Sequence, residues 1–207
     1  GFLHQGQICM SVRRVIVEKA IAREFTEKFV KKVSSLKVGD PKEPDTIVGP
    51  IINNVQLEEI KRNVEGAVRD GAKVLCGGKA IGPCYAPTVI IDVKPGTYFY
   101  REETFGPVVS VIEVEDVEEA LHVANDTNYG LTAGVVTRDI GKGLWVAERI
   151  ESGMVHINDS SVNDEPQMPF GGIKDSGWGR LGGRAALEEF TELRWISIQR
   201  TPRQYPF

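Results

Sequence analysis

The alternation of β-branched runs with segments of helical periodicity constrains the fold of this chain more than any other feature of its sequence. In the second half, strand-like runs at 108–114, 131–137 and 154–157 are separated by helix-like segments at 116–125 and 140–150. Strands that alternate with helices in this way usually form an open, mostly parallel sheet with helices on both faces. The sequence therefore predicts an α/β fold of this kind.

The first half of the chain continues the same pattern. A short strand at 12–17 precedes an amphipathic helix that begins near Ile21, where apolar residues start to recur at helical spacing. A second helix at 57–68 has Asn53 or Asn54 as its N-cap. The remaining predicted strands of this half lie at 74–76 and 88–93.

The C-terminal part is less regular. A glycine-rich stretch at 158–183 has neither helical nor strand periodicity, and loops of this length in a compact domain are usually functional or disordered. A short helix at 184–190 and an apolar strand at 193–199 follow, and a strand of this kind is suited to pairing with another subunit. We therefore expect a cysteine-bearing domain at 1–190 and an oligomerisation strand and tail at 191–207.

The composition excludes several classes of protein. The 207 residues are 41% hydrophobic and 26% charged, as in an ordinary globular domain. The net charge is -4 and there is no long run of lysine or arginine, so we expect no nucleic-acid partner. No apolar stretch reaches about 18 residues, so we expect no membrane partner. Because the chain begins with glycine instead of methionine, we expect it to be the second part of a longer polypeptide.

The cysteines and histidines indicate the compartment and the absence of a metal site. The 3 cysteines form no Cys-x-x-Cys pair, which favours a reducing compartment over a disulfide framework. The 3 histidines are far apart and have no metal-ligand spacing. We therefore expect a cytoplasmic protein without a bound metal.

Cys9 is the first candidate for a functional residue. It follows Gly6, Gln7 and Ile8 and precedes an apolar run, so it lies next to a glycine turn. A thiolate in such a position can act as a nucleophile. An isolated cysteine is more often a small buried core residue, and Cys9 considered alone does not decide between the two roles.

Four short motifs are distributed along the chain: Gly-Gln-Ile-Cys at 6–9, Glu-Glu-Thr-Phe-Gly-Pro at 102–107, Asn-Tyr-Gly-Leu at 128–131 and Pro-Phe-Gly-Gly-Ile-Lys-Asp-Ser-Gly at 169–177. In this order and at these intervals, they resemble the C-terminal, catalytic part of the aldehyde dehydrogenase superfamily. A narrower similarity, to the benzaldehyde, vanillin and salicylaldehyde dehydrogenase group, is carried by residues 157–159, 164–170, 191–196 and 205–207.

This resemblance implies covalent catalysis by Cys9. The thiol would attack the aldehyde carbonyl to give a thiohemiacetal, hydride would pass to NAD or NADP, and the resulting thioester would be hydrolysed to a carboxylic acid. The backbone N–H of Cys9 would form part of the oxyanion hole. The glutamate general base and the dinucleotide-binding domain belong to the family's N-terminal part, which we expect to be absent from this chain. Residues 1–207 alone are therefore expected to be inactive.

The resemblance also implies which residues contact the cofactor. Glu103 would hold the hydroxyls of the nicotinamide ribose, and Phe105 would pack near the ring. The alternative for the two glutamates is a solvated acid pair. Gln56 falls where many relatives carry a glutamine that contacts the cofactor. Three residues later this chain has Glu59 where those relatives often have lysine, which argues against a cofactor contact from that position.

A further set of residues would line the entrance for the aldehyde: Ile8, Met10, Val162 and Phe170. For Phe170, simple packing of an aromatic ring in a glycine-rich loop is the alternative. The segment at 177–182 satisfies the dinucleotide-binding pattern Gly-x-Gly-x-x-Gly. It lacks the βαβ unit that this pattern requires, so we assign it no cofactor role.

One main prediction and two alternatives follow. The main prediction is the catalytic part of an NAD(P)-dependent oxidoreductase that converts a small-molecule aldehyde, preferably aromatic, into a carboxylic acid, and that forms a homodimer or homotetramer. The first alternative is a CoA-acylating relative, in which a thiol instead of water takes the acyl group. The second is an isolated assembly module without catalytic activity.

Overall fold

The computed structural model describes residues 1–206, and Phe207, at the end of the expected tail, lies outside the described residues. The helices are η1 (Leu3–Gly6, a 3-10 helix), α1 (Lys19–Ser34), α2 (Asn54–Arg69), α3 (Tyr98–Arg101), α4 (Val117–Asn125), α5 (Ile140–Ala147) and α6 (Gly183–Glu189). The strands are β1 (Arg14–Glu18), β2 (Lys73–Cys76), β3 (Ala80–Ile81), β4 (Cys84–Tyr85), β5 (Thr88–Ile91), β6 (Val108–Val114), β7 (Tyr129–Gly130), β8 (Thr132–Val135), β9 (Met154–Ile157) and β10 (Ile173–Lys174).

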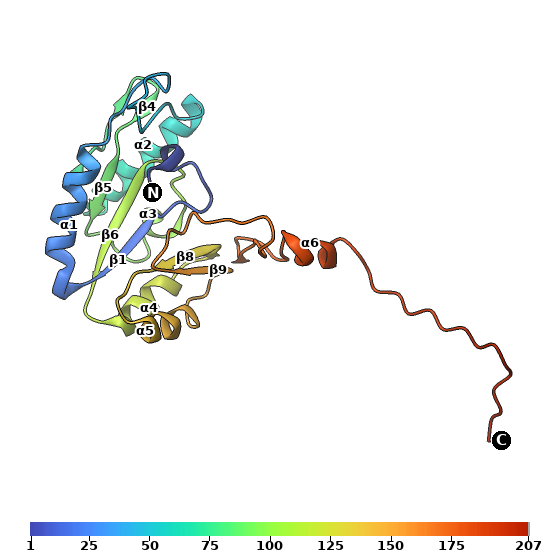
Figure 1. Ribbon diagram of the computed structural model, residues 1–207. Helices are drawn as coiled ribbons and strands as arrows, with labels where there is room; N and C mark the ends of the chain where they lie inside the picture. The colour runs from blue at the N-terminus through green and yellow to red at the C-terminus, as the bar shows by residue number, and fades with distance from the viewer. Residues whose placement is uncertain (207) are drawn as a thin grey trace.

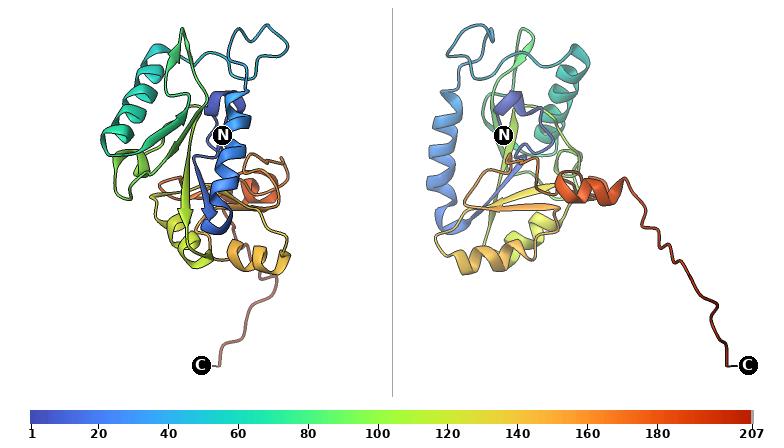
Figure 2. Two further views of the ribbon diagram at one scale, coloured as in Figure 1. Left: turned by 90° about the vertical axis from the view of Figure 1, so that its left-hand side faces the viewer. Right: turned by 45° about the vertical axis from the view of Figure 1, so that its right-hand side comes forward.

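The largest sheet has the strand order β1-β6-β5-β2. β6 is parallel to both β1 and β5, and β2 is antiparallel to β5 at one edge. Helices α1 and α2 lie on opposite faces of this sheet (Figures 1 and 2). The prediction of an α/β fold with a mostly parallel sheet and helices on both faces is therefore confirmed.

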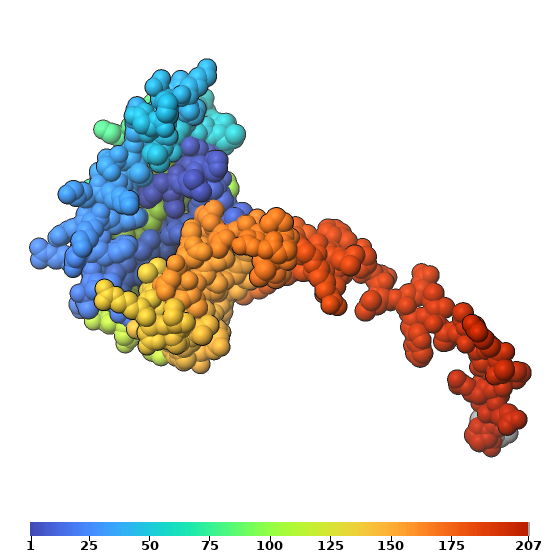
Figure 3. All heavy atoms as spheres, viewed as in Figure 1, coloured from blue at the N-terminus to red at the C-terminus, as the bar shows by residue number. Residues whose placement is uncertain are grey.

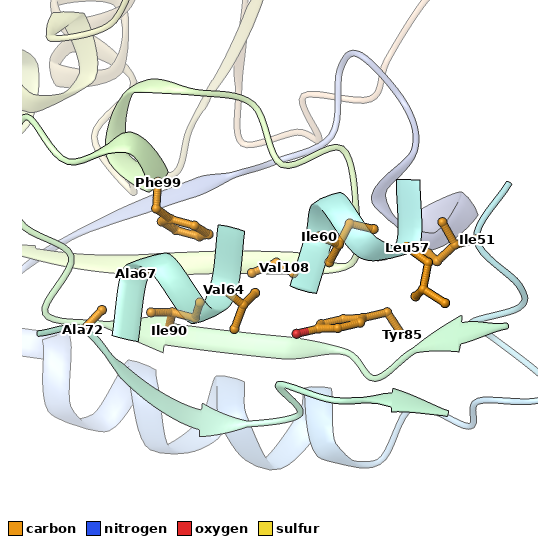
Figure 4. Packing of buried hydrophobic residues seen from close by; sticks show 10 residues of the cluster. All are labelled: Ile51, Leu57, Ile60, Val64, Ala67, Ala72, Tyr85, Ile90, Phe99 and Val108. Atoms are coloured by element: carbon orange, nitrogen blue, oxygen red, sulfur yellow. The ribbon is translucent and has the colours of Figure 1, made fainter. Parts of the chain in front are cut away.

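The alternating side chains of β5 hold both helices against the sheet, because successive residues of a strand point to opposite faces. Val89 belongs to the apolar cluster under α1, together with Ala22 and Val33. Ile90, the next residue, belongs to the cluster under α2, which is drawn in Figure 4. The buried residues of this second cluster are Ile51, Leu57, Ile60, Val64, Ala67, Ala72, Tyr85, Ile90, Phe99 and Val108. Burial of each large side chain contributes about 1.5–3 kcal/mol, so α2 is held firmly in place.

A second parallel pair, β8 and β9, lies outside the main sheet and packs against α5. β6 and β9 have the bounds expected from the sequence, and the other expected helices and strands up to α6 are present with ends shifted by a few residues. Within the described residues, no helix has the length and apolar character needed to cross a lipid bilayer.

The strand expected at 193–199 is not formed in the single chain. The chain beyond α6 extends away from the body of the molecule (Figures 1 and 3). Leu193 and Trp195 are 106% and 92% exposed. A strand requires a hydrogen-bonded neighbour, and no strand described in residues 1–206 pairs with this segment. Pairing with another subunit is not tested by the single chain.

Candidate active site

Cys9 lies in a tight turn between η1 and β1. The Ser11 N–H donates to the carbonyl oxygen of Ile8 at 2.9 Å and closes this turn around Cys9. The Cys9 side chain is exposed, whereas Cys76 is half-buried and Cys84 is buried. The interpretation of Cys9 as a buried core residue is therefore wrong, and Cys9 is the most exposed of the three cysteines.

The segment that carries Cys9 packs directly against the 102–107 motif. Gly6 has a φ of 67°, and a Cβ at this residue would lie 2.1 Å from the carbonyl oxygen of Gly106. Only glycine permits both this dihedral angle and this approach of two backbones. β1 and β6 are adjacent and parallel, so the residues that precede the two strands meet at the same end of the sheet. The candidate site is thus built at the amino ends of these strands.

A pocket of about 20 Å³ lies between the two segments, and Ile8, Arg13, Glu103 and Phe105 are among the residues that line it. This volume accommodates about one water molecule and no cofactor ring. A larger ligand would therefore lie over the exposed side of the two segments, where Glu103 and Phe105 are accessible. The structure brings Ile8, Glu103 and Phe105 together beside the Cys9 turn, as the sequence motifs imply.

The carboxylates of the 102–107 motif have different surroundings. Partial burial raises the pKa of Glu103 above its ordinary value, while the positive charge of Arg13 acts in the opposite direction. Burial lowers the pKa of Arg13 to about 10, so this guanidinium remains charged at neutral pH. Glu102 accepts a hydrogen bond from the Tyr129 hydroxyl at 3.2 Å. The two acids are therefore not an equivalent solvated pair, because Glu102 is attached to the 128–131 motif and Glu103 lines the pocket.

Phe105 has an uncommon backbone conformation. Its φ is 49°, in the left-handed region that residues other than glycine rarely adopt, and its side chain is 37% exposed. The side-chain amide of Gln56 donates to the carbonyl oxygens of Thr104 and Phe105, at 3.1 Å each. Gln56 therefore contacts the 102–107 motif itself, a role that the sequence did not indicate.

Ser161 joins the 158–183 stretch to the Cys9 turn, and sequence reasoning missed it. Its hydroxyl donates to the carbonyl oxygen of Met10 at 2.7 Å, and its own carbonyl accepts from the Thr132 hydroxyl at 3.1 Å. Met10 and the half-buried Val162 are thereby held in adjacent segments. A lone serine in an irregular segment carries no sequence signal, because its partner is distant along the chain.

Phe170 is held in a different way from the other expected substrate-contacting residues. Its N–H donates to the carbonyl oxygen of Leu181 at 2.7 Å, and the Leu181 N–H donates back at 2.8 Å. This places Phe170, which is half-buried, within the 169–181 loop. The pattern at 177–182 in the same loop follows β10, which is antiparallel to β7, so it does not open a βαβ unit.

The remaining motifs are connected to the same site. Ile173 pairs with Gly130 in the short β10–β7 ladder, and the Ser176 hydroxyl accepts from the Gly130 N–H at 3.0 Å. Tyr129 in turn bonds Glu102 of the 102–107 motif. The four sequence motifs therefore form one connected structure.

Among residues 1–206 there is no cluster of three or more side chains suited to binding a metal ion.

Comparison with known proteins agrees with this arrangement. The model of the aldehyde dehydrogenase family matches residues 1–196. Benzaldehyde dehydrogenase YfmT of Bacillus subtilis (strain 168) is 48% identical over 206 residues, and salicylaldehyde dehydrogenase of Pseudomonas sp. (strain C18) is 47% identical over 208 residues. Each alignment covers 100% of this chain and 42% or 43% of the relative.

Solved structures give the same result. The crystal structure of a salicylaldehyde dehydrogenase from Pseudomonas putida G7 complexed with salicylaldehyde has a TM-score of 0.95 and 47% sequence identity. The match covers 100% of this chain and 43% of that one, so this chain spans less than half the length of these relatives. Because the family model, the fold and the four connected motifs agree, the chain belongs to the aldehyde dehydrogenase family.

Proposed function

We propose that this chain is the catalytic part of an NAD(P)-dependent aldehyde dehydrogenase that oxidises aldehydes, preferably aromatic ones, to carboxylic acids. The observation that carries the proposal is the exposed thiol of Cys9 on a turn whose backbone packs against the loop of Glu103 and Phe105. In this proposal the Cys9 thiol is the nucleophile, and Glu103 and Phe105 on the neighbouring loop orient a second ligand, as a two-substrate oxidation requires.

Cys9 acts as the nucleophile in the proposed reaction. Its sulfur forms a bond to the aldehyde carbon, and the carbonyl oxygen takes up the electron pair of the C=O bond, next to the backbone N–H of Cys9. The nicotinamide cofactor, when bound, supplies the two-electron acceptor for the hydride that leaves this carbon. As the hydride leaves, the oxygen electron pair re-forms the C=O bond and gives the Cys9 thioester. Water then attacks this thioester, the C–S bond breaks, and the carboxylic acid, the free thiolate and a proton are released.

The residues present fit the nicotinamide end of a dinucleotide. Glu103 offers carboxylate oxygens that can accept hydrogen bonds from both ribose hydroxyls, and the accessible ring of Phe105 offers an apolar surface. Gln56 is the third residue assigned to this region, through its contact with the same loop. We propose either NAD or NADP, because these three residues are assigned to the nicotinamide end, whereas the two cofactors differ only by a phosphate on the adenosine ribose.

The aldehyde would approach Cys9 along apolar side chains. Ile8 and Met10 flank Cys9 in the chain, and Val162 is held nearby through Ser161. Phe170 would complete this surface from the glycine-rich loop. The similarity to benzaldehyde, vanillin and salicylaldehyde dehydrogenases supports an aromatic substrate.

The proposal extends to assembly and location. Leu193, Trp195, Ile196 and Ile198 are all exposed in the single chain, which supports a homodimer or homotetramer in which 193–199 pairs with a second subunit. Residues 1–190 would then be the catalytic domain, and 191–207 the oligomerisation strand and tail. The free cysteines support a cytoplasmic location.

The experiment that tests this function is a product assay on the complete protein. Benzaldehyde and NAD or NADP are expected to give reduced cofactor and benzoate in equal amounts without coenzyme A. A strict requirement for coenzyme A, with an acyl-CoA product, would support the CoA-acylating alternative instead. If no aldehyde gave reduced cofactor while the Cys9 thiol was free, the proposed oxidation would be wrong. Residues 1–207 alone are expected to show neither saturable NAD binding nor turnover.

A further inference from the structure

The backbone and the side chain of Gln56 already have hydrogen-bond partners within the protein. It lies in the first turn of α2, where its backbone N–H donates to the side chain of the N-cap, Asn53, at 2.9 Å. Its side-chain nitrogen donates to Thr104 and Phe105 at 3.1 Å each. A primary amide has two N–H donors, so both can be used by this loop, and only the side-chain oxygen remains for another partner.

The loop that Gln56 contacts needs external support. The left-handed backbone of Phe105 is energetically unfavourable and persists only where the surroundings impose it. The Gln56 side chain donates hydrogen bonds to the carbonyl oxygens of Thr104 and of Phe105 itself. On its other side, Gly106 lies so close to α2 that a Cβ there would be 2.5 Å from the side chain of Ile60. Two successive turns of α2 therefore hold the loop on both sides of Phe105.

We propose that Gln56 is a positioning residue, which directs the Phe105 ring and the Glu103 carboxylate through the backbone of their loop. This inference rests on the proposed function, because it assigns Glu103 and Phe105 to the nicotinamide end of the cofactor. A misplacement of about 1 Å between reacting groups can slow a reaction about a hundredfold. Loss of the two hydrogen bonds should therefore slow hydride transfer more than it weakens cofactor binding.

The test compares two variants of the complete protein. Gln56→Met keeps the length and the apolar stem of the side chain but removes both donors. Glu58→Met is the matched control, because Glu58 lies in the same helix, is exposed, and bonds Lys61 instead of the loop. For Gln56→Met we expect kcat to fall about ten- to a hundredfold and the cofactor KM to change by less than about threefold. With an aldehyde deuterated at the carbonyl carbon, the isotope effect on kcat should increase. Glu58→Met should match the parent protein.

A mutant cycle tests whether Gln56 acts through Phe105 and Glu103. If it does, adding Gln56→Met to the combined Glu103→Gln and Phe105→Ala variant should reduce kcat by less than about threefold, because both groups being positioned have already been replaced. Independent, multiplied losses would overturn the inference. A cofactor KM that rises tenfold or more with kcat unchanged would show a direct cofactor contact and would also overturn it, as would a Gln56→Met variant with parent kinetics.

Hydrogen exchange separates this inference from the proposed function. The amides of 103–106 should exchange faster in Gln56→Met than in the parent protein or in Glu58→Met, whether or not the protein oxidises aldehydes. Unchanged exchange in this loop would contradict the positioning role. An inactive parent protein whose loop exchange still responds to Gln56→Met would instead contradict the proposed function alone.

Discussion

Glu103 is subject to two opposing influences at the pocket. Partial burial raises its pKa and dominates, while the nearby positive charge of Arg13 limits the increase. An ionised carboxylate offers an acceptor oxygen to each ribose hydroxyl, whereas protonation turns one oxygen into a donor and leaves the group a weaker acceptor. The proposed role of Glu103 therefore weakens as the pH falls through its raised pKa.

Substitution of Glu103 tests this role. Glu103→Gln in the complete protein should slow hydride transfer about tenfold or more and make that step rate-limiting, because neutral amide oxygen is a poorer acceptor than a carboxylate. The esterase activity of the Cys9 thiol should remain largely in place. Stopped-flow measurement of reduced cofactor, compared with hydrolysis of an activated ester, separates the two activities. Equal loss of both would indicate a general-base role or misfolding.

Phe105, Ser161 and Gln56 mark the limit of what the sequence alone could predict about the site. The motif around Phe105 identified the loop, but its left-handed backbone depends on contacts from α2. Ser161 meets Met10 only because the chain folds back after β9. Gln56 was assigned to the cofactor by resemblance, whereas the structure gives its amide donors a backbone partner in the loop. Each of these roles depends on a tertiary contact that no local pattern contains.

At the scale of elements, long periodic segments were predictable and short ones were not. α2 has an Asn53 side chain as N-cap, as expected, and β6 has the expected bounds of a β-branched run. By contrast β3, β4, β7 and β10 have 2 residues each, which is too short to contain a period. The apolar segment 193–199 has strand composition, but composition supplies no hydrogen-bonding partner. The direction of a strand also depends on its partner, so the sequence pattern did not indicate that β2 runs antiparallel to β5.

The contact between the η1–β1 turn and the 102–107 loop predicts a large effect at Gly6. Gly6→Ala would place a Cβ at 2.1 Å from the Gly106 carbonyl oxygen in addition to imposing a φ of 67° on alanine. Gly82→Ala is the matched control, because Gly82 has a φ of 56° but no atom within 4 Å of an added Cβ. Urea unfolding should show a loss of about 1 kcal/mol for Gly82→Ala, from the dihedral strain alone, and a clearly larger loss for Gly6→Ala.

Gly6→Ala should also change the reactivity of Cys9. Displacement of the turn from the 102–107 loop would alter the rate at which iodoacetamide alkylates Cys9, whereas Gly82→Ala should leave this rate as in the parent protein. Equal stability losses in the two variants would mean that the backbone contact between Gly6 and Gly106 is not a close one in solution.

At the scale of the whole molecule, Tyr85 makes the free energy of unfolding depend on pH in the alkaline range. It is 1% exposed, and burial raises its pKa to about 12 from an ordinary value of 10.0. The folded state therefore binds this proton more tightly than the unfolded state does. The resulting stabilisation is complete at pH values below the pKa of Tyr85 in the unfolded state. It is lost as the pH rises through the pKa of Tyr85 in the folded state.

A shift of this size corresponds to about 2–3 kcal/mol of unfolding free energy. The free energy of unfolding of the parent protein should therefore decrease more steeply above pH 10 than that of Tyr85→Phe, which has no phenol to ionise. Tyr98→Phe is the control, because Tyr98 is 59% exposed. Denaturant titrations at several alkaline pH values measure these slopes. If Tyr85→Phe and the parent protein had the same slope, the Tyr85 phenol would not be buried in the folded state.

The exposed C-terminal segment determines the proposed assembly. Deletion of 191–207 from the complete protein should give a monomer or an insoluble protein, because the apolar residues of 193–199 would no longer join two subunits. Deletion of 201–207 alone leaves that segment intact and should preserve the number of subunits found in the parent protein. Multi-angle light scattering distinguishes these outcomes, and an unchanged mass after the longer deletion would exclude 193–199 from the interface.

The central claim is that Cys9 forms the covalent bond to the substrate, and trapping this bond tests it most directly. The complete protein is mixed with benzaldehyde and its nicotinamide cofactor, quenched with acid during turnover, digested, and analysed by mass spectrometry. The peptide that contains Cys9 should carry a benzoyl group, which should be absent without cofactor, and Cys9→Ala should neither be acylated nor turn over. An acyl group on Cys76 or Cys84, or turnover retained by Cys9→Ala, would contradict the claim.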